Sequence, residues 1–519
     1  MKIGLVQPEV IPGDPQRNFE HVAGLCSRAL AEGAEILLLP ENCLSGALLG
    51  DVPGEGEFFA ECEELERRLC ELAGNVPLKF GNAFVLDANG AHEWSGVPEP
   101  MPYVFGQVAS FRKSLQDAAR EHRRAVAYVN AVSAGNAGKS WRAFDGRGLL
   151  VAPSGDLVAE LPAFEPAVRV VDSASSERVE PKPETIADLH AAIALQTRTM
   201  MEVCGIRNVV VGASGGIDSS VVAALMAKIV PPERMLLVNM PSRHNSATTK
   251  GIARRLAENL GTWFAEIPIE PSVELTVAQF GACELRRGGE SRRLELTPAL
   301  LENVQARDRG SRVLAAAAAA FGGVFTCNGN KAECTVGYAT IMGDLSGFFA
   351  PIADLWKHEV YALGRHLNES VYGFEAIPRE TFEIPPSAEL SPAQAVEEGK
   401  GDPIVYPYHD RLFRWWTESE DRPGPLATLE RYASKTLEKT IGAEKGTVDR
   451  LFPGAEAFVA DLERWWTAFC GMGSAKRSFA PPLASVSPWA FGSERSESAL
   501  RPFFPQKYVE LKKSLLSRR

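Results

Sequence analysis

Val209-Val210-Val211-Gly212-Ala213-Ser214-Gly215-Gly216-Ile217-Asp218-Ser219-Ser220 is the stretch around which the chain is organised. The three valines predict a buried parallel strand, and the apolar run that ends at Met226 predicts a helix. Between them, the glycines allow backbone N–H groups to turn toward one point, where the free donors of the first helical turn also point. The stretch therefore predicts a phosphate-binding loop, with Asp218 or Ser219 as the helix cap.

This loop differs from that of kinase-like ATPases, because no lysine follows Gly216. Instead, Asp218 brings a carboxylate close to the phosphates, where it is suited to hold Mg²⁺. For the isolated pattern, a glycine-rich turn without a ligand is the alternative.

The composition limits the class of protein. A chain of 519 residues predicts two or three domains. The formal net charge of −11 argues against non-specific nucleic-acid binding and against an anionic-membrane anchor. The nine cysteines are scattered without metal-ligand spacing, which is typical of reduced thiols in a cytoplasm. The apolar start, residues 1–6, is too short for a signal peptide, so we expect a cytoplasmic protein with no nucleic-acid or membrane partner.

The first third of the chain predicts a parallel strand–helix–strand crossover. Lys2–Val6 and Glu35–Leu39 have strand patterns, and Asn18–Ala31 between them has a helical pattern. Glu41 then follows the carboxyl end of the second strand, where functional sites gather.

This region resembles the nitrilase-like amidases. The resemblance is carried by Gln7-Pro8, Gly13-Asp14, Asn18, Gly33-Ala34, Pro40-Glu41 and Ser45-Gly46. It implies an α-β-β-α sandwich and a Glu–Lys–Cys triad, in which Glu41 matches the general base.

The other two members of that triad are not found. We predict the third strand at Gly81–Leu86, which places Lys79 before it, and the helix that normally follows the nucleophile at Phe111–Glu121. Roughly sixty residues of the usual pattern are absent, judged against ordinary domain sizes. Cys62 and Cys70 lie on a predicted helix and are interpreted as packing residues. Because a cysteine nucleophile needs a base to form its thiolate, we expect a degenerate domain over residues 1–175, with Glu41 as a vestige of the glutaminase site.

The second part of the chain predicts a doubly wound parallel sheet. A polar linker, 176–184, precedes a domain over 185–519. Predicted strands at Met235–Met240 and Thr262–Ile267 flank a predicted helix at Thr249–Leu260. The fold class is therefore α/β in both parts.

The second part closely resembles NAD⁺ synthetases, which belong to the PP-loop, or adenine nucleotide α-hydrolase, class. The motifs that carry the resemblance occur in the family's order: the Ser-Gly-Gly loop, Glu302–Arg307, Asn328–Glu333, Gly337-Tyr338, Gly343-Asp344, Pro351–Lys357, Pro385–Leu390 and Lys476-Arg477. The amidase-like first part fits, because glutamine-dependent members carry a nitrilase-like domain ahead of the synthetase.

The resemblance implies an ATP-dependent ligase that converts deamido-NAD⁺ to NAD⁺. An acyl-adenylate forms with release of pyrophosphate, and ammonia then displaces AMP. The implied ATP-binding residues are Gly212, Ala213, Ser214, Gly215, Gly216, Ile217, Asp218, Ser219, Asn328, Lys357 and Ser387. The implied deamido-NAD⁺ residues are Asn303, Arg307, Glu333, Lys476 and Arg477, and Mg²⁺ is assigned to Asp218 and Glu333. Glu333 is used by the family for either purpose.

Several alternatives stay open at this point. Because the glutaminase Lys and Cys are not found, we expect ammonia as the nitrogen source, either free or from an external donor. The family also implies a homodimer or a higher homo-oligomer. The rival interpretations are a catalytically silent nucleotide sensor and another PP-loop amidating enzyme, such as a GMP synthetase or a tRNA-thiolating enzyme.

Overall fold

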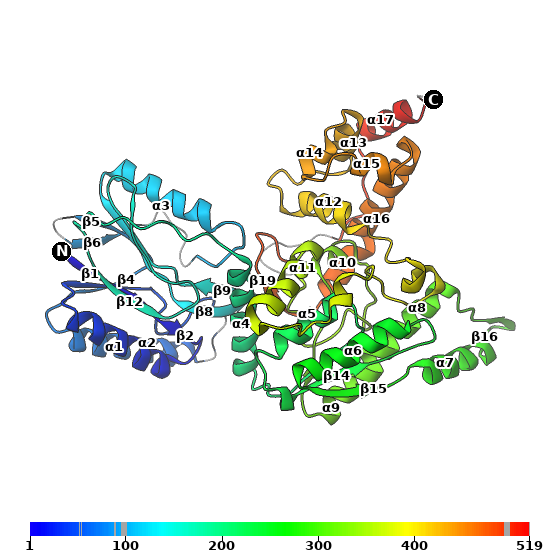
Figure 1. Ribbon diagram of the computed structural model, residues 1–519, viewed down its shortest axis with the longest axis horizontal. Coiled ribbons are helices and arrows are strands. Elements are labelled where there is room, and N and C mark those ends of the chain that lie inside the picture. Colours follow the sequence, from blue (N-terminus) through cyan, green and yellow to red (C-terminus); the bar gives the residue numbers. More distant parts are fainter. Residues whose placement is uncertain (51, 53, 88–89, 95–100, 492–498, 518–519) are drawn as a thin grey trace. The chain divides into compact units, whose positions relative to one another are not determined.

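A computed structural model describes residues 1–50, 52, 54–87, 90–94, 101–491 and 499–517. The chain forms two compact units (Figure 1). Unit 1 comprises Met1–Cys204 and Ala484–Pro488, and unit 2 comprises Gly205–Leu483 and Trp489–Arg519. None of the described helices combines the length and apolar character needed to cross a bilayer.

The first sheet of unit 1 has the strand order β12-β1-β3-β4. Strands β1, β3 and β4 are parallel, and β12 pairs with β1 in the antiparallel sense. Two helices pack their apolar residues against the outer face of this sheet. The elements are β1 (Lys2–Gln7), β3 (Ile36–Leu39), β4 (Leu78–Phe80), β12 (Ala167–Asp172), α1 (Pro15–Ala31) and α2 (Glu55–Ala73).

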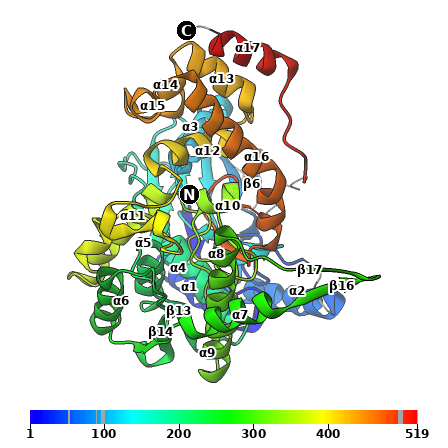
Figure 2. The same ribbon diagram turned by 90° about the vertical axis from the view of Figure 1, so that its right-hand side faces the viewer.

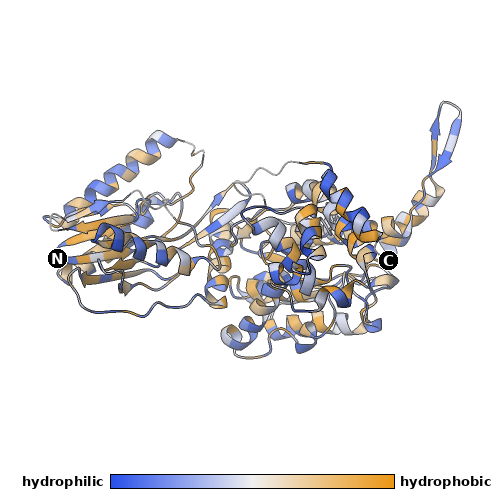
Figure 3. Cartoon of the chain, turned by 90° about the horizontal axis from the view of Figure 1, so that it is seen from above, coloured by the Kyte–Doolittle hydropathy of each residue, from blue (hydrophilic) through white to orange (hydrophobic). Residues whose placement is uncertain are grey.

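The second sheet of unit 1 has the order β11-β10-β7-β5-β6, with antiparallel neighbours. One core cluster joins the facing sides of the two sheets, and another joins the second sheet to helix α3. Unit 1 is thus an α-β-β-α sandwich with predominantly apolar strands, as predicted (Figure 3). The elements are β5 (Ala83–Asp87), β6 (Gly90–Glu93), β7 (Ala125–Tyr128), β10 (Leu149–Val151), β11 (Leu157–Glu160) and α3 (Val108–His122).

The strand predicted at Gly81–Leu86 is present as β5, but its place as the third strand is wrong. β4 ends at Phe80 and pairs with β3, and β5 begins at Ala83 and belongs to the other sheet. Lys79 therefore lies within the third strand of the first sheet rather than before it. The sequence hides this change of sheet because both short strands are apolar and only two residues separate them.

A third, small sheet of unit 1 has the order β19-β9-β8-β2. Its strands are β2 (Glu9–Val10), β8 (Val132–Ala137), β9 (Ser140–Asp145) and β19 (Leu483–Ser485). Helix α4 (Ile186–Val203) packs on β8 and β9, so this helix belongs to unit 1. The compact units therefore do not follow the predicted boundary at residue 185, and the division at 1–175 and 185–519 stays a prediction about domains.

Unit 2 is built on a parallel sheet of order β15-β14-β13-β18. The strands are β13 (Val209–Gly212), β14 (Met235–Asn239), β15 (Trp263–Glu266) and β18 (Val324–Phe325). Because β14 and β15 extend the sheet on one side of β13 and β18 on the other, the winding direction reverses beside β13. Ligands of such sheets bind at the carboxyl ends of the strands at this reversal.

Helices cover both faces of this sheet. Val210 and Val238 point to the face covered by the π-helix η2 (Asp308–Leu314) and helix α9 (Ala315–Ala320). Since side chains alternate along a strand, Val209 and Val211 point to the other face, on the side of α5 (Ile217–Met226) and α6 (Ala247–Leu260). The predicted doubly wound sheet is confirmed.

The remaining elements of unit 2 extend from this sheet. Helix α7 (Glu270–Ala282) leads into the hairpin β16 (Glu284–Arg287) and β17 (Glu290–Arg293), which projects away from the sheet (Figure 2). Unit 2 also contains short helical turns, namely η1 (Pro232–Arg234), η3 (Leu367–Tyr372), η4 (Arg379–Phe382), η5 (Pro392–Gln394) and η6 (Val396–Glu398). The other helices are α8 (Pro298–Arg307), α10 (Lys331–Val336), α11 (Lys357–His366), α12 (Tyr406–Glu418), α13 (Pro425–Ala433), α14 (Leu437–Ile441), α15 (Thr447–Leu451), α16 (Ala455–Phe479) and α17 (Gln506–Leu516).

Candidate active site

The turn between β13 and α5 has the shape that its glycines allow. Gly215 has a φ of +86°, and a Cβ added there would lie 2.2 Å from the carbonyl oxygen of Thr249. The Ser214 hydroxyl accepts a hydrogen bond from the Gly216 N–H, and the Ser219 hydroxyl accepts one from the Ser214 N–H. The loop is therefore held by its own serines, and glycine is required where it passes closest to α6.

The predicted helix cap is wrong. The N-cap of α5 is Gly216, without a side-chain hydrogen bond to the first turn, and Asp218 lies inside that turn. Amides of a first helical turn have no acceptor within the helix, so they remain available to an anion. Because Asp218 does not cap the helix, its carboxylate is free for other contacts.

Two side chains from distant elements bind the Asp218 carboxylate. Lys357 Nζ, at the start of α11, lies 2.5 Å from Oδ2. Asn330 Nδ2, at the N-cap of α10, donates to Oδ1 at 3.2 Å. Burial disfavours the charged Lys357, but the attraction of Asp218 and Glu333 outweighs it and raises its pKa above the usual range. The ammonium is therefore charged at the edge of the phosphate loop.

Glu333 is the second carboxylate of this group. Its Oε1 lies 3.6 Å from Lys357 Nζ and accepts a hydrogen bond from the Tyr406 hydroxyl at 3.0 Å. Burial and the nearby charge of Asp218 raise the pKa of Glu333 to about 8, against the opposing effect of Lys357. Asp402, which accepts from the same Tyr406 hydroxyl at 3.1 Å, also has a raised pKa because of burial. Both carboxyls therefore hold their protons more strongly than exposed carboxyls do.

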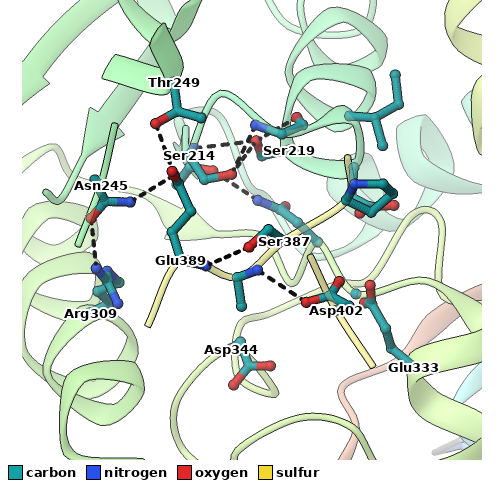
Figure 4. A pocket seen from close by; sticks show the side chains of 18 of the residues that line it. Ser214, Ser219, Asn245, Thr249, Arg309, Glu333, Asp344, Ser387, Glu389 and Asp402 are labelled. Carbon is teal, nitrogen blue, oxygen red and sulfur yellow. Dashed lines mark hydrogen bonds between the residues drawn. The ribbon is translucent and has the colours of Figure 1, made fainter. Parts of the chain in front are cut away.

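These groups line one cavity at the carboxyl ends of β13 and β18 (Figure 4). Most predicted ATP residues are among its lining residues: Gly212, Ser214, Gly216, Ile217, Asp218, Ser219, Asn328, Lys357 and Ser387, together with Glu333. Ala213 and Gly215 form the buried side of the loop. The cavity therefore lies where the strand order places a ligand site.

Asn328 and Ser387 line the cavity while bonding to the protein itself. Asn328 Nδ2 donates to the Gly212 carbonyl at 3.0 Å, and its Oδ1 accepts from the Thr326 hydroxyl at 2.8 Å. The Ser387 hydroxyl donates to the Gln394 carbonyl at 2.7 Å. In this state both side chains fix loops around the cavity, and their contact with ATP stays a prediction.

The sequence analysis missed a second set of cavity residues. Arg309 in η2 donates to the Met240 carbonyl at 3.0 Å and to Asn245 Oδ1 at 3.2 Å. Asn245 in turn donates to Glu389, which also accepts from the Thr249 hydroxyl at 2.8 Å (Figure 4). Burial lowers the pKa of Arg309 to about 10, although nearby acids oppose this, so the guanidinium remains charged. A signal was present, because Arg309 follows Arg307 by two residues.

Of the predicted dinucleotide residues, Glu333 lines the cavity and the other four lie elsewhere. Asn303, Arg307, Lys476 and Arg477 are not among the described residues that line the cavity. Arg307 is exposed and ends α8. The structure places the four on α8 and α16, and their contacts with the dinucleotide stay predictions.

Arg477 and Lys476 differ from each other in their surroundings. Arg477 is buried and donates through Nη1 to the carbonyls of Thr335, at 2.5 Å, and Phe469, at 3.1 Å. Lys476 is half-buried, and its Nζ donates to the Gly337 carbonyl at 2.7 Å. Arg477 thus joins α16 to α10, while Lys476 keeps part of its side chain accessible.

The carboxylates suit Mg²⁺ in chemistry but not in number. Asp218 and Glu333 offer the oxygen donors that Mg²⁺ prefers, and a bound cation would favour the ionised form of Glu333, whose pKa is raised first by burial and then by the charge of Asp218. Within the part of the chain that the structure describes, no group of three or more His, Cys, Asp or Glu side chains could hold a metal. A Mg²⁺ held here would need phosphate and water oxygens to complete its coordination.

Unit 1 offers no comparable site at Glu41. The residue is exposed in the turn after β3. Cys26 and Cys43 are buried, and burial raises the pKa of the Cys26 thiol to about 12 and that of Cys43 above its usual range. Burial also raises the pKa of Cys62 and of Cys70 on α2. These four thiols are therefore protonated at neutral pH, whereas a cysteine nucleophile needs a lowered pKa.

Comparisons with known proteins agree with this arrangement. The NAD synthase family model matches residues 189–445. A curated glutamine-dependent NAD(+) synthetase from Xylella fastidiosa strain 9a5c is 33% identical over 575 aligned positions, which cover 95% of this chain and 97% of the relative. A solved glutamine-dependent NAD(+) synthetase from Cytophaga hutchinsonii shares the fold, with a TM-score of 0.73, 16% identity and coverage of 99% of both chains. A second, from Acinetobacter baumannii in complex with ADP, gives a TM-score of 0.60 at 20% identity and covers 96% of this chain and 98% of that one. The chain therefore belongs to the NAD synthetase family.

Proposed function

We propose that this protein is an ATP-dependent NAD⁺ synthetase that amidates deamido-NAD⁺ with ammonia. The observation that carries the proposal is the Asp218 carboxylate, bound by Lys357 and Asn330 at the edge of the Ser-Gly-Gly loop. A loop that presents free amides, flanked by a lysine and by carboxylates suited to Mg²⁺, is the arrangement that a nucleoside triphosphate requires. The Acinetobacter relative, which binds ADP, supports the nucleotide assignment.

The reaction proceeds in two substitutions. An oxygen of the nicotinate carboxylate attacks the α-phosphorus of ATP, and the bond to the β-phosphate oxygen breaks to release pyrophosphate. Ammonia then attacks the acyl carbon of the adenylate, loses a proton and expels AMP, which leaves the amide. The protein contributes position and charge rather than a covalent nucleophile.

Different residues around the cavity bind the phosphates, the metal and the dinucleotide in this proposal. The amides of Gly216 to Ser219 bind pyrophosphate, and Lys357 neutralises charge on the phosphates. Asp218 and Glu333 would hold Mg²⁺, which would supply charge neutralisation for the phosphates. Arg309, in η2, also lines the cavity and is a further cation for an anionic substrate. Asn303, Arg307 and Lys476 bind deamido-NAD⁺.

Ammonia is proposed as the nitrogen source because unit 1 lacks an activated thiol at Glu41. Two further observations support this. The alignment with the Xylella relative runs over 575 positions, more than the 519 residues of the chain, so part of that relative has no counterpart here. Lys79 lies within β4, and not after it where the amidase pattern has its lysine. A partner protein that supplies ammonia is the alternative to free ammonium.

One assay tests both parts of the proposal. Purified protein is given ATP, Mg²⁺ and deamido-NAD⁺ with either ammonium chloride or glutamine, and NAD⁺, AMP and pyrophosphate are measured. We expect NAD⁺ with ammonium and none with glutamine. NAD⁺ formation from glutamine that disappears in Cys43→Ala or Cys62→Ala would contradict the ammonia assignment. ATP binding without any pyrophosphate release would favour a nucleotide sensor instead.

We also propose that the protein is a homodimer in the cytoplasm. Helix α7 has no buried residue, and Leu275 on it is 59% exposed, with Val277 and Phe280 also exposed. Large apolar side chains grouped in this way are typical of a protein contact surface. Light scattering of the wild type and of Leu275→Asp tests this, since the variant is expected to be monomeric.

A further inference from the structure

A fully buried lysine that the proposed reaction does not use lies next to the site. Lys331, the first residue of α10, has an exposed fraction of 0%. Its Nζ lies 2.8 Å from Asp354 Oδ1 and 2.7 Å from Glu418 Oε1. Burial disfavours its charge, but the two carboxylates outweigh this and raise its pKa, so the cluster is ionic. Buried ion clusters are costly to desolvate and weak evidence for stability, which raises the question of what this one does.

Glu418, at the end of α12, is the common acceptor of the cluster. Its Oε1 accepts from Lys331 Nζ and, at 2.8 Å, from the indole Nε1 of Trp356. Its Oε2 accepts from Arg414 Nε at 2.8 Å. A single carboxylate therefore binds side chains from the start of α10 and from the residue that precedes α11.

Two of the three side chains that donate to Glu418 are sequence neighbours of the two that donate to Asp218. Lys331 follows Asn330, and Trp356 precedes Lys357. A direct backbone hydrogen bond, from Lys331 N–H to the Leu355 carbonyl at 2.8 Å, also joins the two segments. The separation of Asn330 from Lys357, and with it the position of the Asp218 carboxylate, depends on how closely α10 and α11 are held.

We infer that Glu418, through Lys331 and Trp356, is a positioning residue that holds the starts of α10 and α11 together so that Asp218 faces the nucleotide. This inference rests on the proposed function for the identity of the ligand. Glu418 does not line the cavity within the described residues and touches no reacting group, so its effect on the site passes through the two helix starts.

The position of Glu418 gives this role a physical basis. Long side chains such as lysine lose much conformational freedom on burial, and a lysine held by two carboxylates cannot change rotamer without breaking both ion pairs. The cluster therefore fixes one spacing between α10 and α11. A neutral side chain in place of Glu418 would allow other spacings. Loss of that spacing weakens nucleotide binding more than it changes the chemical step.

The test compares Glu418→Gln with a matched control, Asp461→Asn. Asp461, in α16, resembles Glu418 because it binds an ionisable side chain and an indole. It accepts hydrogen bonds from His409 Nε2 and from Trp465 Nε1, each at 3.0 Å. Neither partner adjoins a residue that binds Asp218. Both substitutions remove a largely buried carboxylate charge, so both are expected to lower the melting temperature.

Steady-state kinetics with ammonium and calorimetric titration with ATP are measured on the full-length variants. We expect Glu418→Gln to raise the KM and Kd for ATP about tenfold, the equivalent of one charged hydrogen bond, with kcat within about twofold. Asp461→Asn is expected to leave both constants unchanged. Equal ATP constants for Glu418→Gln and the wild type would overturn the inference, as would an equal rise in both variants.

Two further measurements allow the test to decide if a variant does not fold or if no NAD⁺ is formed. If Glu418→Gln does not fold, Arg414→Met removes the outer hydrogen bond to Glu418, together with a 3.5 Å ion pair to Glu359, from a side chain that is 43% exposed, and a smaller rise in the ATP constants is expected. If the wild type binds ATP but forms no NAD⁺, the proposed function fails, and the ATP Kd values of the same variants still decide the positioning role.

Discussion

Lys357 Nζ and the Asp218 carboxylate are 2.5 Å apart at the carboxyl end of the central strand of unit 2. The same ammonium lies 3.6 Å from Glu333, so one lysine lies within ion-pair distance of two acidic side chains. Under the proposed function, Asp218 and Glu333 would hold Mg²⁺, which would neutralise their charge, and Lys357 would then be able to contact the phosphates.

Asp218→Asn should reduce activity far more than stability. The amide keeps the shape of the side chain but cannot attract Lys357 or bind Mg²⁺ as a carboxylate does. We expect kcat/KM for ATP to fall about a hundredfold or more, measured as pyrophosphate release at saturating ammonium. Asp172→Asn, an exposed carboxylate of unit 1, is the control and should keep wild-type activity. Full activity of Asp218→Asn would exclude the assigned role.

Glu333 should make the ligand-free protein less stable as pH rises. Burial and Asp218 raise its pKa to about 8 from an ordinary value of 4.5, so the folded state keeps a proton that the unfolded chain releases. The contribution of Glu333 to stability is complete at pH values below its pKa in the unfolded chain. It is lost as pH rises through its pKa in the folded protein. This group alone lowers the free energy of unfolding by up to about 1.4 kcal/mol per pH unit between about pH 5 and 8.

Chemical denaturation across that pH range, in EDTA and without nucleotide, measures this slope. Glu333→Gln removes the titrating proton, so its unfolding free energy should fall less steeply with pH than that of the wild type. Glu57→Gln on α2, where the side chain is exposed, should leave the slope as it is. Parallel slopes for the wild type and Glu333→Gln would show that the carboxyl is already ionised in the folded state.

The sequence predicted the parts of the fold and site that depend on local pattern. The strand, turn and helix around Gly212–Ser219 follow from hydrophobic runs and glycines, which act over a few residues. Arg309 was missed because successive helical residues turn by about 100°, so Arg307 and Arg309 face different directions and spacing cannot say which one faces the ligand. Glu389, Asn245 and Asp402 were missed because they meet the loop only after the chain has folded.

Gly215→Ala should disrupt the loop, because the added Cβ would meet the Thr249 carbonyl oxygen at 2.2 Å on a backbone with φ of +86°. We expect a loss of stability of about 1–3 kcal/mol and loss of ATP binding. The control is Gly251→Ala in α6, where a Cβ meets no atom within 4 Å. In a helix interior that change should stabilise by about 0.5–1 kcal/mol. Thermal unfolding and calorimetric ATP titration distinguish the two glycines, and normal ATP affinity in Gly215→Ala would refute the tight approach of the loop to α6.

Lys476 and Arg477 should respond differently to removal of their charge, although they are adjacent in sequence. Arg477→Met leaves the buried carbonyls of Thr335 and Phe469 without this donor, at a cost of about 1–3 kcal/mol for each, so a lower melting temperature is expected. Lys476 is half-buried, and its burial lowers its pKa. The negative charge of Asp344 raises that pKa and the positive charge of Arg307 lowers it, so the lysine lies within electrostatic reach of both residues. Lys476→Met should therefore raise the KM for deamido-NAD⁺ about tenfold, as the loss of one charge-assisted contact with an anionic ligand does, with a nearly unchanged melting temperature. If Arg477→Met instead changes only that KM, its guanidinium must leave the two carbonyls to reach the dinucleotide, and α16 would have to move relative to α10 on binding.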